Sequence, residues 1–242
     1  MKPALSAQQE KFTSEKNSRL KTYREYVVGS QGTLHFAYYE LCTLLFGGLP
    51  GLLGFGARSI CYPPLFERCG RKVAFGKNLI IRGPKSITLG NKVLIDDFAS
   101  VEARGNNASV SLGDFVSIGR FTTVAAKGGS IVIEAGANIG SYCRVATNSR
   151  VQIGESALIA AYCYIGPGNH RAGEDGKPLI SSEMEIKDGV RIGAHSWIGA
   201  KATILDGVSI GERAIVGAHS LVRDDVPDGA VVAGTPARII SK

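Results

Sequence analysis

The sequence predicts a mainly β protein built as a parallel β-helix, and three features of its pattern support this prediction. An aliphatic residue recurs at every sixth position, most clearly at Ile192, Ile198, Ile204, Ile210, Val216 and Val222. A small or β-branched residue stands two positions before each of them, at Val190, Ser196, Ala202, Val208, Ala214 and Ser220. The steps also come in groups of three, and longer spacings fall only between the groups, which is typical of a repeat protein.

Each group of three predicts one turn of a triangular coil with three short strands. The earlier groups are Leu89, Ile95 and Val101; Leu112, Ile118 and Val124; Ile133, Ile139 and Val145; and Ile153, Ile159 and Ile165, after an incomplete group at Phe75 and Ile81. Because extra residues always follow the third strand, they bulge from one corner. A helix cannot hold a strict six-residue repeat, and a hairpin protein would lack triplets in register. We therefore expect a β-helix over residues 73–225, inside a domain of residues 73–242.

Five cysteines are present and none forms a CxxC pair, which favours a reducing compartment. Cys143 and Cys163 occupy the same inward position in consecutive coils, in line with Thr122 and Ala202. A buried cysteine behaves as a small hydrophobic residue, so we interpret both as core-filling side chains.

Residues 1–72 lack the repeat. Residues 5–26 predict a polar, basic helix, and residues 41–57 carry no charge. That stretch is short for a membrane span and contains several glycines and a proline, so an in-plane or re-entrant membrane anchor fits better. The alternative is that it packs on the β-helix or on a neighbouring subunit. The net charge of +7 comes with no nucleic-acid-binding motif, and the polar start predicts a cytoplasmic protein, peripheral on the inner membrane's cytoplasmic face.

The segment VRIGAHSWIGAKATILDGVSIGERAIVGAHSLVRDDVPDGAVVAGTPARII, residues 190–240, closely resembles the C-terminal half of hexapeptide-repeat acyltransferases. The nearest resemblance is to maltose- and galactoside-type O-acetyltransferases and to acetyltransferases of polysaccharide and lipopolysaccharide synthesis. The repeat resemblance covers residues 73–242. It implies a left-handed β-helix, a homotrimer with active sites between adjacent subunits, and acetyl-coenzyme A or another acyl-coenzyme A as co-substrate, with no metal.

The resemblance implies that His170 is the catalytic residue, within a loop of residues 166–189. A sugar hydroxyl is a poor nucleophile at neutral pH, and a neutral imidazole can take its proton as it attacks a thioester. Acceptor binding is expected at Asn169 and at Ser141, the position nearest to an asparagine that orients the acceptor in the family.

The resemblance also implies acyl-coenzyme A contacts. Trp197 of the WIG segment is expected to line the cleft, Ala200 and Ala218 to offer backbone groups to the pantetheine arm, and Arg238 to contact phosphate. The family's Thr-Lys pair is replaced here by Arg223 and Asp224, so the cation moves by one residue.

The expected function is O-acetylation of a saccharide, in a cell-envelope polysaccharide or a lipid-linked glycan precursor. N-acylation of an amino sugar is the alternative. Two remoter alternatives are a zinc enzyme like the γ-carbonic anhydrases and a non-catalytic β-helix scaffold. The zinc enzyme would need ligands such as His170, His195 and His219, but their spacing provides no close pair.

Overall fold

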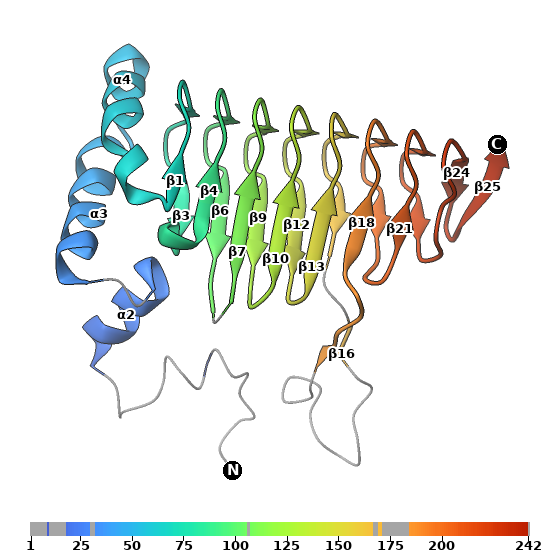
Figure 1. Ribbon diagram of the computed structural model, residues 1–242, viewed down its shortest axis with the longest axis horizontal. Coiled ribbons are helices and arrows are strands. Elements are labelled where there is room, and N and C mark those ends of the chain that lie inside the picture. Colours follow the sequence, from blue (N-terminus) through green and yellow to red (C-terminus); the bar gives the residue numbers. More distant parts are fainter. Residues whose placement is uncertain are drawn as a thin grey trace, which may run out of the picture.

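The computed structural model describes Gln9 and residues 18–29, 32–105, 107–166, 169–170 and 184–241. The described chain is mainly β, a parallel β-solenoid with helices packed at its N-terminal end (Figure 1). The helices are α2 (Arg19–Val28), α3 (Thr33–Phe46) and α4 (Gly51–Cys61), and short 3-10 turns lie at Pro63–Leu65 and Pro84–Ser86. The predicted fold class is confirmed. Its left-handed sense stays a prediction.

The chain runs through three sheets in turn, here called A, B and C. Sheet A contains β1 (Arg68–Cys69), β4 (Ile87–Leu89), β7 (Ser109–Leu112), β10 (Ser130–Ile133), β13 (Arg150–Ile153), β18 (Val190–Ile192) and β21 (Ser209–Ile210). Sheet B contains β2 (Ala74–Phe75), β5 (Leu94–Ile95), β8 (Ser117–Ile118), β11 (Asn138–Ile139), β14 (Leu158–Ile159), β19 (Trp197–Ile198), β22 (Ile215–Val216), β24 (Val231–Gly234) and β25 (Ala237–Ser241). Sheet C contains β3 (Ile80–Arg82), β6 (Ser100–Ala103), β9 (Thr123–Ala126), β12 (Arg144–Thr147), β15 (Tyr164–Ile165), β20 (Thr203–Ile204) and β23 (Leu221–Val222).

The register of the sheets follows the six-residue repeat. Ile131, for example, pairs with Val110 on one side and Val151 on the other, all in parallel strands. The predicted inward residues of both kinds are buried, from Val190 and Ile192 to Ser220 and Val222. The core is therefore a set of aliphatic columns along the solenoid axis, as the periodicity predicts.

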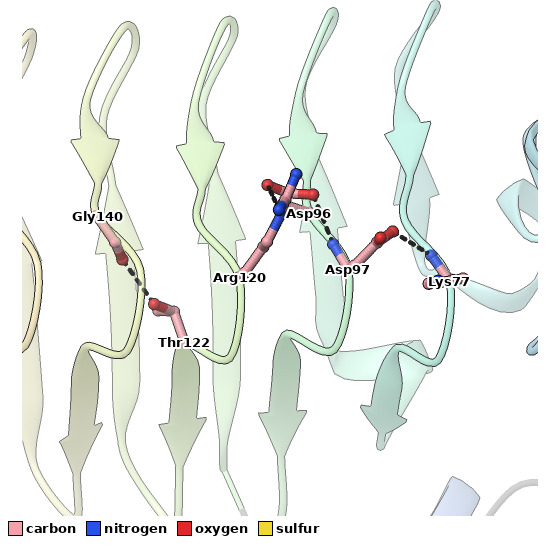
Figure 2. Close-up of polar contacts among 6 residues, drawn as sticks. All are labelled: Lys77, Asp96, Asp97, Arg120, Thr122 and Gly140. Atoms are coloured by element: carbon pink, nitrogen blue, oxygen red, sulfur yellow. Dashed lines mark hydrogen bonds and ion pairs between the residues drawn. The ribbon is translucent and has the colours of Figure 1, made fainter.

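Two of the three corners are tight turns, and each has a column of residues with positive φ. At the B–C corner this column contains stacked aromatic rings, with neighbouring centroids 4.9 Å apart at each step: Phe98, Phe121, Tyr142 and Tyr162. Polar side chains tie adjacent coils at the same corner (Figure 2). Asp97 accepts the backbone N–H of Lys77 at 2.8 Å. The C–A corner holds the longer insertions, as expected.

One buried column at the B–C end of the core is polar, and each member binds a carbonyl of the next coil. The hydroxyl of Thr122 donates to the carbonyl of Gly140 at 2.6 Å. The thiol of Cys143 donates to Ala160 at 3.0 Å, and that of Cys163 to Gly199 at 3.2 Å. Both cysteines are buried, which agrees with their interpretation as core residues.

The solenoid begins before residue 73, because β1 already pairs with β4 through Cys69 and Leu89. The sequence pattern missed this strand since a cysteine, rather than an aliphatic residue, occupies its inward position. At the other end, β24 and β25 form an antiparallel hairpin that the repeat did not predict, with a cis peptide between Thr235 and Pro236.

The uncharged stretch of residues 41–57 belongs to two helices, which separate at residues 47–50. Arg58 of α4 is buried and holds this break in place. Its Nη1 donates to the carbonyls of Phe46 and Leu49 at 2.9 and 2.7 Å, and its Nε donates to Phe75 of the first coil at 3.0 Å. One face of the helices therefore packs on the solenoid, as the alternative interpretation required. Within the described residues, no helix is long and apolar enough to cross a membrane.

Candidate active site

The strand that carries His170 leaves the solenoid at the C–A corner. The chain emerges from β15, and β16 (Asn169–His170) pairs antiparallel with β17 (Met184–Glu185) before sheet A resumes (Figure 1). His170 faces Met184 in this register, and Asn169 faces Glu185. The side chains of Asn169 and His170, and residues 167–168 and 171–183 of the expected loop, lie outside the described part. The long insertion thus begins as a two-stranded stem.

Trp197 lies on the outer face of sheet B, in the coil that follows His170. Its strand pairs with Leu158 on one side and Ile215 on the other, and its side chain is 49% exposed. A core tryptophan would be buried, so the exposure leaves the indole available to a ligand.

Ala200 and Ala218 both follow sheet B at the B–C corner. The carbonyl of Ala200 accepts the backbone N–H of His219 at 2.9 Å, so this oxygen already takes part in the ladder between coils. Ala218 is exposed. The two alanines occupy equivalent positions in consecutive coils and line the same side of the corner.

The C-terminal hairpin brings three of the expected residues together. The carboxylate of Asp224 lies 3.7 Å from Nε of Arg223 and 3.5 Å from Nη1 of Arg238. All three side chains are more than half exposed and line a small cavity of about 200 Å³. Two guanidinium groups on one exposed carboxylate can exchange it for phosphate, which offers more acceptor oxygens.

Within one chain, Ser141 and His170 are not close. Ser141 lies at the B–C corner, where its carbonyl accepts the N–H of Tyr162 at 3.0 Å. His170 lies beyond the C–A corner, so the length of a sheet C strand separates the two. The acceptor role of Ser141 stays a prediction, and it would require a second copy of the chain.

The three histidines of the zinc alternative lie at three different corners. His170 follows the C–A corner, His195 lies at the A–B corner, and His219 lies at the B–C corner. No group of three metal-binding side chains is found in the described part of the chain. A single chain therefore does not gather these histidines around one ion.

The structure also has a hollow that the sequence did not predict, of about 550 Å³, on the last coils of sheet A. Its lining includes Arg191, Glu212, Asp225 and Asp228. Because the carboxylates outnumber the cation, it suits the phosphates of a coenzyme poorly. These residues stand in solvent-facing positions of the repeat, which carry no periodic signal.

Residues 189–224 match the family model described as bacterial transferase hexapeptide, six repeats. A Mycobacterium tuberculosis protein named as an acetyltransferase, Rv3034c, is 32% identical over 90 residues, which are 37% of this chain and 30% of that protein. The Escherichia coli K12 protein WbbJ, named as a lipopolysaccharide biosynthesis O-acetyl transferase, is 32% identical over 118 residues, 46% of this chain and 60% of that protein. The chain therefore spans less than two-thirds of the length of either relative.

Among solved structures, the polySia-specific acetyltransferase NeuO superposes with a TM-score of 0.53 and 25% identity, over 72% of this chain and 80% of that one. The chain thus belongs to the hexapeptide-repeat transferases, as its resemblance implied.

Proposed function

We propose that the chain is an acetyl-coenzyme-A-dependent O-acetyltransferase that acts on a saccharide of the cell envelope, with His170 as general base. The observation that carries this proposal is the stem of β16 and β17, which holds His170 outside the core in the coil before Trp197. The names of Rv3034c, WbbJ and NeuO support an acetyl donor, and the last two support a saccharide acceptor.

The chemistry needs one proton acceptor and two bound substrates. The His170 imidazole takes the proton of the acceptor hydroxyl as its oxygen attacks the thioester carbonyl carbon. The carbon–sulfur bond then breaks, and coenzyme A leaves as a thiol after taking up a proton. Both substrates meet in one complex, so no acyl-enzyme is needed. Arg223 and Arg238 would hold phosphate, and the exposed Trp197 would pack along the pantetheine arm.

The proposed active unit is a homotrimer. His170 and Ser141 lie at opposite ends of a sheet C strand, so one chain presents only part of the predicted acceptor site. A neighbouring copy that places its B–C corner against the C–A corner of the first would bring both predicted residues to one cleft.

We also propose that α3 and α4 contact the cytoplasmic face of an anionic membrane. Five apolar side chains on these helices are 77% to 88% exposed: Leu34, Leu44, Leu52, Leu53 and Ile60. The neighbouring helix α2 adds Arg19 and Lys21, both exposed. An apolar surface with nearby cations fits a peripheral membrane contact, and acetyl-coenzyme A is available on that side.

The function is tested by incubating the purified chain with acetyl-coenzyme A and a panel of saccharide acceptors. Release of the coenzyme thiol and a mass increase of one acetyl group on the acceptor are expected together. Treatment with hydroxylamine should remove the acetyl group, because it cleaves esters and leaves amides intact. A hydroxylamine-resistant product would favour N-acylation instead. Absence of thioester consumption with every acceptor, including extracted envelope glycans, would contradict the proposal.

A further inference from the structure

A row of cations lies along the C–A edge of sheet C. Arg82 ends β3, Arg104 follows β6, Lys127 follows β9, and Arg144 begins β12. The backbone places two of them in adjacent coils, since Ala103 pairs with Ala126 and the next residues are Arg104 and Lys127. We call these four side chains the cationic row.

The helix α2 holds the first two members in fixed positions. The guanidinium carbon of Arg82 lies 4.4 Å from the ring centroid of Tyr26, and that of Arg104 lies 4.8 Å from the same centroid. The carboxylate of Glu102 lies 2.7 Å from Nε of Arg104 and also accepts the hydroxyl of Ser100 at 2.7 Å. The cationic row therefore has one carboxylate built into it against four positive charges.

The positive charges act on one another. Loss of hydration lowers the pKa of Lys127, and the nearby Arg144 and Arg104 lower it further. A second anion in the row would relieve this repulsion, because opposite charges stabilise the protonated amine.

The cationic row leads to the strand of His170. Arg144 pairs in register with Tyr164 of β15, and β16 follows β15 after the corner. Figure 1 shows α2 at one end of this edge and β16 at the other, with the loops of the intervening coils between them. Neighbouring parallel strands lie about 4.8 Å apart, so Lys127, two coils before β15, lies roughly 10 Å from its level along the axis.

We propose that the cationic row binds oxyanions of the acceptor, carried as carboxylate or phosphate on groups adjacent to the sugar that is acetylated. This inference rests on the proposed function and narrows its acceptor to anionic glycans. Guanidinium groups bind carboxylate and phosphate through paired hydrogen bonds, and two of the three here are already oriented by Tyr26. A charged unit held one or two sugars away would align the reacting hydroxyl without touching it.

The test compares the double variant Lys127→Gln/Arg144→Gln with the matched control Arg71→Gln/Lys72→Gln. Both replace one exposed arginine and one exposed lysine, and the control pair lies at the A–B corner. Calorimetry at low salt measures binding of hexagalacturonate, neutral maltohexaose and inorganic pyrophosphate to each full-length protein. Stronger binding of hexagalacturonate assigns the row to carboxylate glycans, and stronger binding of pyrophosphate assigns it to phosphate.

The cationic-row variant is expected to weaken anion binding about tenfold, as loss of two charge-assisted contacts implies. It should also reduce the ratio of kcat/KM for an anionic acceptor to that for its neutral analogue, while the control keeps both. Circular dichroism checks the fold, and the single variant Lys127→Gln replaces the double one if that fails to fold. No binding of either anion to the unmodified protein, or equal losses in both double variants, would overturn the proposal. If no acceptor is acetylated, the proposed function fails, and calorimetry still decides whether the cationic row binds anions.

Discussion

Asp224 and Arg238 meet across the C-terminal hairpin, with the carboxylate oxygen of Asp224 3.5 Å from Nη1 of Arg238. The same carboxylate approaches Arg223. Asp224 follows β23 and Arg238 lies in β25, so the ion pair joins the last coil to the closing hairpin. Because both side chains are exposed, the pair contributes little to stability, and its main effect is to occupy cations that phosphate could use.

Replacing Arg238 by Gln should therefore raise the KM for acetyl-coenzyme A about tenfold, because one charge-assisted phosphate contact is lost. Asp224→Asn should act in the opposite direction and lower that KM about twofold to threefold, since it frees both guanidinium groups at little cost in stability. Steady-state kinetics at saturating acceptor measure both effects. The exposed Arg213 at the A–B corner offers the control Arg213→Gln, and an unchanged KM in both test variants would contradict the assignment.

Replacing His170 by Ala should lower kcat by a factor of about 10²–10⁴, which is typical for the loss of a general base. The fold should persist, because His170 lies on the stem outside the solenoid core. Light scattering should give the same mass for variant and unmodified protein, near three times 25.6 kDa for the proposed trimer. The control is His195→Asn, since Asn tolerates the positive φ of His195. Near-normal turnover by the His170 variant would exclude this base.

The sequence predicts the solenoid well because the core itself is periodic. Each inward position recurs at a fixed step, so Ile131 and Ile198 could be assigned from spacing alone. The cationic row has no such signal. Arg82, Arg104, Lys127 and Arg144 are separated by unequal numbers of residues, and they come into line only because the insertions at the C–A corner differ in length. The site that needs two corners, at Ser141 and His170, likewise depends on assembly rather than on local pattern.

The buried thiols should be protected from alkylation. Its hydrogen bond with Cys163, together with burial, raises the pKa of Cys143, and burial raises the pKa of Cys69 to about 11. In the folded protein at pH 8, peptide mass spectrometry should find Cys143 and Cys163 unlabelled by iodoacetamide, and all five cysteines labelled in denaturant. Cys69 holds its proton longer when folded than when unfolded. It therefore stabilises the fold fully below pH 9, and this contribution is lost as the pH rises toward 11. Rapid labelling of native Cys143 would contradict this account.

The exposed leucines of α3 and α4 should control membrane binding. The double variant Leu44→Ser/Leu53→Ser should weaken sedimentation with vesicles of phosphatidylglycerol and phosphatidylcholine, because each buried leucine contributes about 1.5–3 kcal/mol. Its melting temperature should change little, since both side chains face solvent. The control Ile80→Ser/Leu94→Ser removes two partly exposed apolar residues from the strands. Equal vesicle binding by the two variants would show that the helices do not contact lipid.

The stacking of coils also makes the solenoid a ruler. The helices sit against β2 and β3, and the strand of His170 follows β15, so the two are separated by whole coils. Four steps along sheet C, from β3 to β15, correspond to about 19 Å at a strand spacing near 4.8 Å. Adding or removing a coil would change this reach in fixed increments and leave the corners that build the site unaltered. A protein of this design can match the height of its reacting centre to its acceptor by changing coil number alone.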